Sequence, residues 1–270
     1  LVAAAAITNE SVQKSAGQDV FFWAPDPGSS ASCTVGGNLA CNAAGPHAVK
    51  YGTTRENTLG LKVVTGEGKI LQTGTYTTKG AVGYDLTRLL IGSEGTLGVI
   101  VEATLKLIPL PEEKRTFCAY YDSITAAADA VSQIMAQPIM PCALEFLDEK
   151  TIELLNRNQP FNFPQNTKAM LMIEIDGTSY ALPEDYMAIQ QAAKLSGLIH
   201  LETAKNEEES KNLWAARKAL SPLLRTIAPK KINEDIVVPV SKMPNFIEKI
   251  QQLSEKYQIM IVNFGHGGNG

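Results

Sequence analysis

The sequence predicts a protein of mixed helices and strands, organised in two parts. Fourteen of the 21 glycines fall between Gly28 and Gly98, a density that is too high for helices and is typical of tight turns. After residue 116 the pattern changes to alternating strands and helices, which fits the α/β and the α+β class equally well. Pro109 and Pro111 separate the two patterns, and residues 112–115 follow them as a predicted linker.

The first part contains the signals of three strands and one short helix. Leu59–Thr65 and Lys69–Thr73 are apolar runs of strand length, and a glycine-rich turn lies between them. Leu97–Leu107 alternates as a strand does, and Asp85–Ile91 is a short apolar helix or turn. We therefore expect a hairpin and a third strand in this part.

The second part contains alternating strands and helices whose bounds follow from periodicity and from end signals. Ser123 and Asp148 are suited to cap the helices that follow them, and Gly197 is suited to end a helix. The predicted strands are Phe117–Tyr121, Cys142–Leu147, Ala169–Ile175, Leu198–Leu201, Ile232–Val238 and Ile259–Phe264. The predicted helices are Ser123–Ala136, one after Asp148, one with Pro183 in its first turn, Glu207–Arg225 with a kink at Pro222, and Met243–Tyr257.

The composition excludes several classes of protein. A hydrophobic fraction of 44% and a charged fraction of 19% are those of an ordinary globular protein. The net charge of −4 gives no cationic surface for nucleic acid or for an anionic membrane. No apolar run reaches the roughly 18 residues of a spanning helix. The four cysteines contain no C-x-x-C pair, which argues against an iron–sulfur or structural zinc site and favours reduced thiols in the cytoplasm.

Both ends of the chain have sequences that are unusual for termini. The first methionine is Met135, and the last residues form a glycine-rich loop directly after a predicted apolar strand. We therefore expect the chain to be part of a longer protein.

The segment from residue 25 to residue 45 has the residue types of an anion-binding loop. Gly36 and Gly37 allow backbone N–H groups to turn toward one point, and Thr34 and Asn38 add hydrogen-bonding side chains beside them. A helix that begins at about Leu39 would direct its positive end at the anion. The alternative is a tight structural loop, which a bare Gly-Gly-Asn more often forms.

Two longer runs carry a resemblance to a known family. PDPGSSASCTVGGNLACNAAGPHAVKYG and GYDLTRLLIGSEGTLGVIVEATLKL closely resemble the FAD-linked oxidases of the vanillyl-alcohol oxidase type, in the branch of D-lactate dehydrogenases, D-2-hydroxyglutarate dehydrogenases and the flavin subunit of glycolate oxidase. The resemblance implies the α+β class. Residues 1–112 would be the C-terminal half of an FAD-binding domain, and residues 113–270 a truncated substrate-cap domain of antiparallel sheet and helices. An earlier glycine-rich loop of the family has no counterpart here, so we expect the FAD site to be incomplete.

The resemblance assigns three groups of residues to FAD. Those implied to contact the ribityl chain and the pyrophosphate are Pro25, Asp26, Ser29, Thr34, Gly36, Gly37 and Asn38. Those implied to flank the isoalloxazine are Ala40, Asn42, Ala43 and Gly45, and those on the adenosine side are Glu94, Gly98, Val99 and Ile100. We expect His47 to be a loop histidine and not a covalent flavin attachment site, because a lone histidine is weak evidence for one.

A cation in the second part is suited to bind a substrate carboxylate. A guanidinium is the natural bidentate partner of a carboxylate, and Arg217 stands in a W-x-x-R pattern. The alternative is a solvated surface charge. The resemblance implies that Arg217 holds the carboxylate of a 2-hydroxyacid, and it extends less directly to Ser221 and Lys231 because the loop between them does not align clearly.

The last residues resemble the start of the family element G-H-x-G-[DN]-G-N-x-H, in which two histidines bind a divalent metal such as zinc. His266 would be the first ligand of an incomplete site, since zinc needs about three protein ligands. The alternative is an ordinary histidine near the end of the chain.

The resemblance implies that the parent protein oxidises a D-2-hydroxyacid, with glycolate and D-lactate as the first choices, by hydride transfer to FAD. Electrons would pass to an acceptor or a partner subunit, and the chain as given would hold FAD weakly and be inactive. Two other classes stay open: a non-catalytic flavin-binding or scaffold subunit, and a metal-dependent enzyme without flavin, built on His266. A homodimer and a peripheral position at the inner membrane are both compatible with this expectation.

Overall fold

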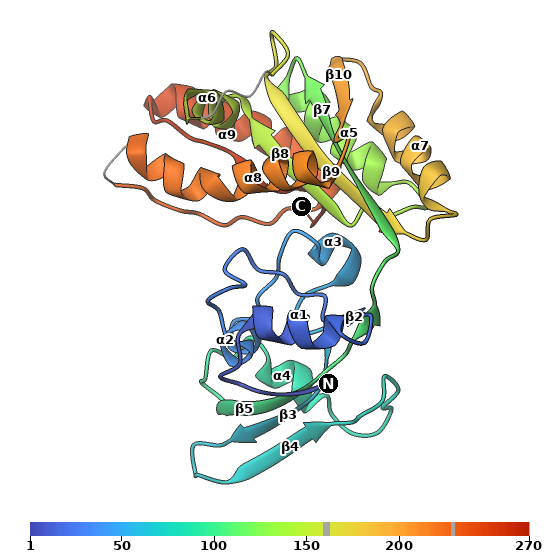
Figure 1. Ribbon diagram of the computed structural model, residues 1–270. Helices are drawn as coiled ribbons and strands as arrows, with labels where there is room; N and C mark the ends of the chain where they lie inside the picture. The colour runs from blue at the N-terminus through green and yellow to red at the C-terminus, as the bar shows by residue number, and fades with distance from the viewer. Residues whose placement is uncertain (159–162, 228–229, 270) are drawn as a thin grey trace. The chain divides into compact units, whose positions relative to one another are not determined.

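The computed structural model describes residues 1–158, 163–227 and 230–269, which divide into two compact units, Leu1–Leu110 and Pro111–Gly270 (Figure 1). Each unit has its own sheet and its own hydrophobic core. Among the described helices, none combines the length and the low polarity that crossing a membrane requires.

The first unit is built on a four-stranded antiparallel sheet with the strand order β1-β5-β3-β4. Its strands are β1 (Val2–Ala4), β3 (Thr58–Val64), β4 (Ile70–Gly74) and β5 (Val99–Leu105). A separate pair joins β2 (Phe21–Phe22) to β6 (Ile108–Pro109). The predicted hairpin and the predicted third strand are confirmed.

Four short helices complete the first unit: α1 (Asn9–Gly17), α2 (Val35–Ala40), α3 (Ala48–Tyr51) and α4 (Leu86–Leu90). The side chain of Asp85 caps α4, which confirms the short helix predicted there. The predicted start of a helix at Leu39 is wrong. The helix begins at Val35, because the Thr34 hydroxyl caps it by accepting a hydrogen bond from the Gly37 amide at 3.2 Å.

The second unit is built on a five-stranded antiparallel sheet with the order β10-β7-β9-β8-β11. Its strands are β7 (Glu113–Tyr121), β8 (Ala143–Asp148), β9 (Ala169–Gly177), β10 (Leu198–Thr203) and β11 (Phe264–His266). The antiparallel sheet confirms the α+β class. The linker predicted over residues 112–115 is wrong, because β7 begins at Glu113 and pairs with β9 over its full length. That pairing satisfies backbone groups which a linker would leave to water.

Alternate residues of the sheet face two layers of helices. Phe117 and Tyr121 on β7 belong to one core, whereas Cys118 and Tyr120 on the same strand belong to another. The helices of the first core are α5 (Ile124–Met135), α7 (Leu182–Ala193) and α9 (Met243–Tyr257). Those of the second core are α6 (Glu149–Asn158) and α8 (Glu207–Ile227) (Figure 1). Cover on both faces explains why the inner strands β8 and β9 are buried along nearly their whole length and mainly apolar, without alternation.

Side-chain caps begin two of the helices where the sequence predicts them. The Ser123 hydroxyl accepts from the Ala126 amide, and Asp148 Oδ1 accepts from the Thr151 amide at 2.9 Å. Asp148 Oδ2 also accepts from the backbone and the side chain of Asn263, at 2.6 and 3.1 Å. Burial raises the pKa of Asp148 above its ordinary value, although these hydrogen bonds act in the opposite direction.

Three predicted features of the second unit need correction. The helix predicted to end at Gly197 ends at Ala193, and Gly197 lies in the turn before β10 with a φ of 91°. No strand forms over residues 232–238, where Ile232 is 86% exposed and no pairing partner exists among the described residues. The strand predicted over residues 259–264 has the wrong bounds: β11 covers Phe264–His266, and the Asn263 amide just before it donates to the Asp148 side chain.

Gly36 permits the close packing of α2 on the segment that follows β1. A Cβ atom at this position would lie 2.7 Å from Ala5 Cβ and 3.1 Å from Ala5 O. The Gly36 amide donates to the same carbonyl at 2.8 Å, so the helix cannot retreat without losing that hydrogen bond.

We therefore expect Gly36→Ala to lower the free energy of unfolding by about 1–3 kcal/mol, the usual cost of overpacking. Urea unfolding of the variant and the wild type measures the difference. Gly66→Ala in the β3–β4 turn is the control, because nothing lies within 4 Å of its Cβ position. Equal losses in the two variants would contradict the packing role of Gly36.

Candidate functional site

The residues predicted to contact FAD lie in neighbouring segments of the first unit. One segment runs from residue 25 through α2 to Gly45, and the other covers residues 94–100. The Gly92 amide donates to Leu39 O and the Glu94 amide donates to Ala40 O, both at 2.9 Å. The structure therefore brings together two motifs that are far apart in the sequence.

The anion nest predicted at Gly36 and Gly37 does not form through their own amides. The Gly36 amide donates to Ala5 O, and the Gly37 amide donates to the Thr34 hydroxyl. Both amides therefore have acceptors within the first unit, because the helix begins at Val35 and not at Leu39. A contact of these glycines with a ligand would therefore not use their N–H groups in this arrangement.

Two predicted asparagines hold the loops in shape. Asn38 is 4% exposed, and its side-chain amide donates to Asn9 Oδ1 at 3.2 Å. Asn42 has a positive φ of 50°, and its Oδ1 accepts from the Thr53 hydroxyl at 2.8 Å and from the Arg55 amide at 3.1 Å. Their side chains stabilise the fold of the segment that carries the predicted FAD contacts.

Asp26 joins the start of this segment to its end. His47 Nδ1 contacts Asp26 Oδ2 at 2.5 Å, and the His47 amide donates to Asp26 Oδ1. A Cβ atom on Gly45 would lie 2.1 Å from Asp26 Oδ1, so this approach requires glycine at position 45. Gly98 is also required by packing, since its Cβ would lie 2.6 Å from Val63 Cγ1.

Gly28 differs from these internally required glycines. It is exposed, nothing lies within 4 Å of its Cβ position, and its φ is not positive. The described residues therefore give no internal reason for glycine there. A bare backbone beside the exposed Ser29 fits the close approach of a ligand such as a nucleotide. Of the other predicted contacts, Pro25 is buried, Ala40, Ala43 and Ile100 are half-buried, and Glu94 and Val99 are exposed.

The α6/α8 face of the second unit's sheet buries two glutamates that the sequence reasoning missed. Glu145 on β8 is 0% exposed and Glu174 on β9 is 1% exposed. The signal that marks them is one acidic residue between apolar neighbours in each of the predicted strands Cys142–Leu147 and Ala169–Ile175. A buried carboxylate needs hydrogen-bond donors, and α8 supplies one to each.

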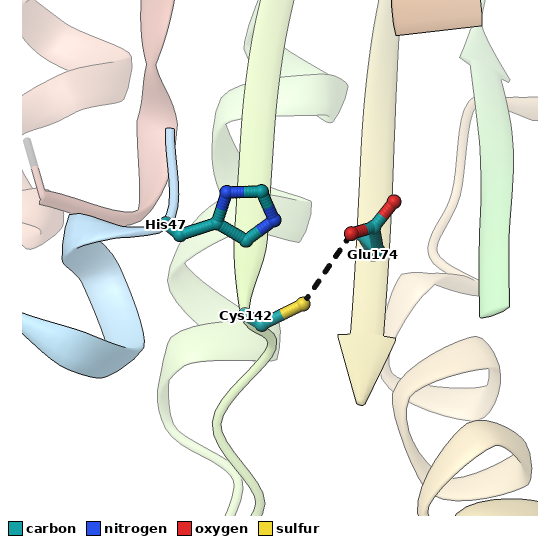
Figure 2. A group of neighbouring side chains, drawn as sticks. All are labelled: His47, Cys142 and Glu174. Atoms are coloured by element: carbon teal, nitrogen blue, oxygen red, sulfur yellow. Dashed lines mark hydrogen bonds between the residues drawn. The ribbon is translucent and has the colours of Figure 1, made fainter. Parts of the chain in front are cut away.

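Glu174 is bound by groups from two elements. Trp214 Nε1 donates to its Oε2 at 2.7 Å, and the Thr116 hydroxyl donates to the same oxygen at 2.8 Å. Cys142 directly precedes β8, the strand that pairs with β9, and its thiol is 3.9 Å from Glu174 Oε1 (Figure 2). Trp214, Thr116 and Cys142 thus surround the Glu174 carboxylate on the α6/α8 face of the sheet.

Glu145 brings together the two residues of the second unit that the sequence singled out most clearly. Arg217 Nε donates to its Oε2 at 2.7 Å, and His266 Nδ1 contacts its Oε1 at 2.5 Å. The Arg217 guanidinium also lies 4.9 Å from the centre of the Phe264 ring. The Arg217 side chain is 16% exposed, and its terminal N–H groups make no hydrogen bond to any described residue.

Two further groups on this face are neutral at physiological pH. Burial raises the pKa of Cys118 to about 12, a hydrogen bond with Tyr120 lowers it, and the nearby Glu202 charge raises it. Burial also raises the pKa of Tyr120, whose hydroxyl donates to Glu202 Oε2 at 3.2 Å. Neither group is therefore suited to act as a nucleophile or a base.

Ser221 and Lys231 are the remaining residues of the second unit that the resemblance assigns to the substrate. Ser221 lies in α8, and its side chain is outside the described part of the structure. Lys231 lies directly before residues 232–238, where the predicted strand does not form. Within the second unit, the described residues contain no group of three His, Cys, Asp or Glu side chains close enough to share a metal ion. The metal at His266 stays a prediction.

Several curated proteins are similar to the chain along nearly its whole length. Glycolate oxidase subunit GlcD of Bacillus subtilis is 42% identical over 249 residues, which are 92% of this chain and 53% of that protein. D-lactate dehydrogenase of Anaerostipes hadrus is 34% identical over 258 residues, which are 92% of this chain and 54% of that protein. The chain thus spans about half the length of these curated relatives.

A solved structure and two family models agree with these relatives. An alkyldihydroxyacetonephosphate synthase has the same fold, with a TM-score of 0.73 at 19% identity over 95% of this chain and 52% of that one. Residues 1–74 match the FAD binding domain. Residues 110–270, more than half of the chain, match the C-terminal domain of the FAD linked oxidases. The chain therefore belongs to the FAD-linked oxidases.

Proposed function

We propose that this protein oxidises a 2-hydroxyacid, with D-lactate and glycolate as the first substrates to test and FAD as the hydride acceptor. The observation that carries the proposal is the arrangement at Glu145, where one buried carboxylate holds an arginine and a histidine. A 2-hydroxyacid presents a carboxylate and a neighbouring hydroxyl, which are the groups that these two side chains are suited to bind.

Arg217 is proposed to bind the substrate carboxylate. Its Nε is already bonded to Glu145, which restricts the plane of the guanidinium. The terminal nitrogens are left for a bidentate pair with a second carboxylate, the geometry in which arginine surpasses lysine. Because the side chain is only 16% exposed, the pair would form with less competition from water than on an open surface.

His266 is proposed to act on the substrate hydroxyl. An ionised carboxylate only accepts hydrogen bonds, so Nδ1 carries the proton in the contact with Glu145. In the neutral ring Nε2 is then the nitrogen that accepts a hydrogen bond or a proton. The same nitrogen is also suited to ligate a divalent metal such as zinc. The described residues of the second unit do not complete a metal site, and no step is assigned to one.

The first unit is proposed to hold FAD, which supplies the acceptor for the hydride when it is bound. The exposed backbone at Gly28 supports this role, because it gives a ligand room where packing does not require glycine. The proposed contacts remain those that the resemblance implies, apart from the amides of Gly36 and Gly37, which are used internally. A partner subunit that accepts electrons is part of the proposal, in line with the description of GlcD as a subunit.

The function is tested by mixing the full-length, flavin-loaded protein with D- and L-2-hydroxyacids in the absence of oxygen. We expect D-lactate or glycolate to bleach the flavin absorbance near 450 nm, because the flavin takes up the hydride (about two electrons per flavin). The corresponding acids without the hydroxyl, propionate and acetate, are the controls. Bleaching by NADH or NADPH and by no hydroxyacid would show that the proposed substrate class is wrong.

Arg217→Lys is expected to lower kcat/KM for the hydroxyacid by about 100-fold, mainly through a higher KM. Lysine keeps the charge but loses the fork and the Nε bond to Glu145. Steady-state kinetics of the full-length protein give the measurement. Arg225→Lys is the matched control, since Arg225 is exposed in the last turn of the same helix. An unchanged KM in Arg217→Lys would mean that Arg217 does not bind the substrate.

Gly28→Ala is expected to weaken FAD binding by at least about tenfold while leaving the stability of the apoprotein unchanged. The added methyl group meets no protein atom within 4 Å, so its effect would come from the ligand. Flavin fluorescence during titration of the apoprotein measures the affinity. Gly66→Ala, whose Cβ position is equally open, is the control. FAD affinity equal to that of the wild type would exclude close contact at Gly28.

A further inference from the structure

Both oxygens of Glu145 are engaged by residues that come from distant parts of the chain. Glu145 lies on β8, Arg217 on α8 and His266 on β11. The carboxylate is fully buried, whereas the Arg217 side chain is 16% exposed and the His266 side chain 43% exposed. The Glu145 carboxylate is therefore inside the protein, whereas the Arg217 and His266 side chains that it binds are partly accessible to solvent.

A purely structural role accounts poorly for this arrangement. A buried ion pair contributes little net stability, because desolvation of the charges offsets most of their attraction. Well-packed apolar side chains would stabilise the same three elements as well or better. The specific consequence of a carboxylate is geometric: it fixes which nitrogen of each partner is used and leaves the others for a ligand.

We propose that Glu145 is a positioning residue for the oxidation reaction, acting on the substrate through Arg217 and His266 together. This inference rests on the proposed function. Its Oε2 holds Arg217 Nε, and the terminal nitrogens of the guanidinium make no hydrogen bond to any described residue. Its Oε1 takes the proton-bearing Nδ1 of His266, so Nε2 is the free acceptor. One carboxylate thereby sets the spacing between the carboxylate-binding group and the hydroxyl-binding group.

Glu174 provides a matched comparison within the same face. It is as buried as Glu145, lies on the neighbouring strand, and is also bound by a side chain of α8. Its partner on α8 is Trp214, whose indole only donates. Arg217 and His266 make their hydrogen bonds to Glu145, and the described residues show none from either of them to Glu174. Replacement of each glutamate by glutamine removes a buried charge while keeping the size.

The first test is spectroscopic and does not depend on turnover. The full-length protein is labelled with ¹⁵N-histidine, and the signals of His266 are identified by their loss in His266→Gln. We expect the neutral ring of His266 to carry its proton on Nδ1, and Glu145→Gln to move protons to Nε2 while Glu174→Gln leaves the ring unchanged. An Nε2–H ring in the wild type would overturn the inference, even if Glu145→Gln failed to fold.

The second test is kinetic and uses the hydroxyacid that bleaches the wild-type flavin. Glutamine has one acceptor oxygen for two donors, so one contact is lost. We expect Glu145→Gln to raise KM and to lower kcat by about tenfold each, whereas Glu174→Gln changes each by less than about threefold. Equal effects of the two substitutions would overturn the inference, because loss of a buried charge would then explain both.

The two tests separate failure of this inference from failure of the proposed function. If no hydroxyacid reduces the wild-type flavin, the proposed function is wrong, and the positioning role of Glu145 in that reaction is wrong with it. If hydroxyacids reduce the flavin but Glu145→Gln behaves like Glu174→Gln in both tests, only the role of Glu145 is wrong.

Discussion

Two carboxylates, Glu145 and Glu174, are buried in the α6/α8 face of the second unit, and α8 must place a hydrogen-bond donor against each of them. An unpaired carboxylate in such a place would cost several kcal/mol, so each needs a donor. Trp214 and Arg217 are three residues apart and therefore lie on the same side of their helix, with Cβ atoms about 5–6 Å apart. Neighbouring strands lie about 4.8 Å apart, so one turn of α8 reaches both β9 and β8. The W-x-x-R pattern follows from this match between helix and sheet.

Glycine serves two different purposes in the first unit. At Gly36, Gly45 and Gly98 a methyl group would strike the protein itself, so these positions allow loops and strands to pack closely. At Gly28 the space is open. A glycine-rich sequence is therefore not by itself evidence of a ligand site. Some of its glycines allow close packing within the protein, and only those with open space beside them leave room for a ligand. The distinction depends on neighbours that are remote in sequence, such as Ala5 beside Gly36.

Local signals in the sequence predicted much of the fold, and long-range pairing accounts for most of the errors. The caps predicted at Ser123 and Asp148 depend on residues three positions away, and both are confirmed. The strand predicted over residues 232–238 has a suitable pattern but no neighbour to pair with among the described residues. Family resemblance singled out Arg217 and His266. Their shared partner escaped notice, because Glu145 lies 72 and 121 positions away from them.

Asp148 performs two tasks with one side chain, since one oxygen caps α6 and the other holds Asn263 just before β11. The helix start and the approach to His266 therefore share a single point of attachment. Loss of the aspartate would therefore release the start of α6 and the segment before β11 together, so damage at this one position reaches two elements that are more than 100 residues apart in the sequence.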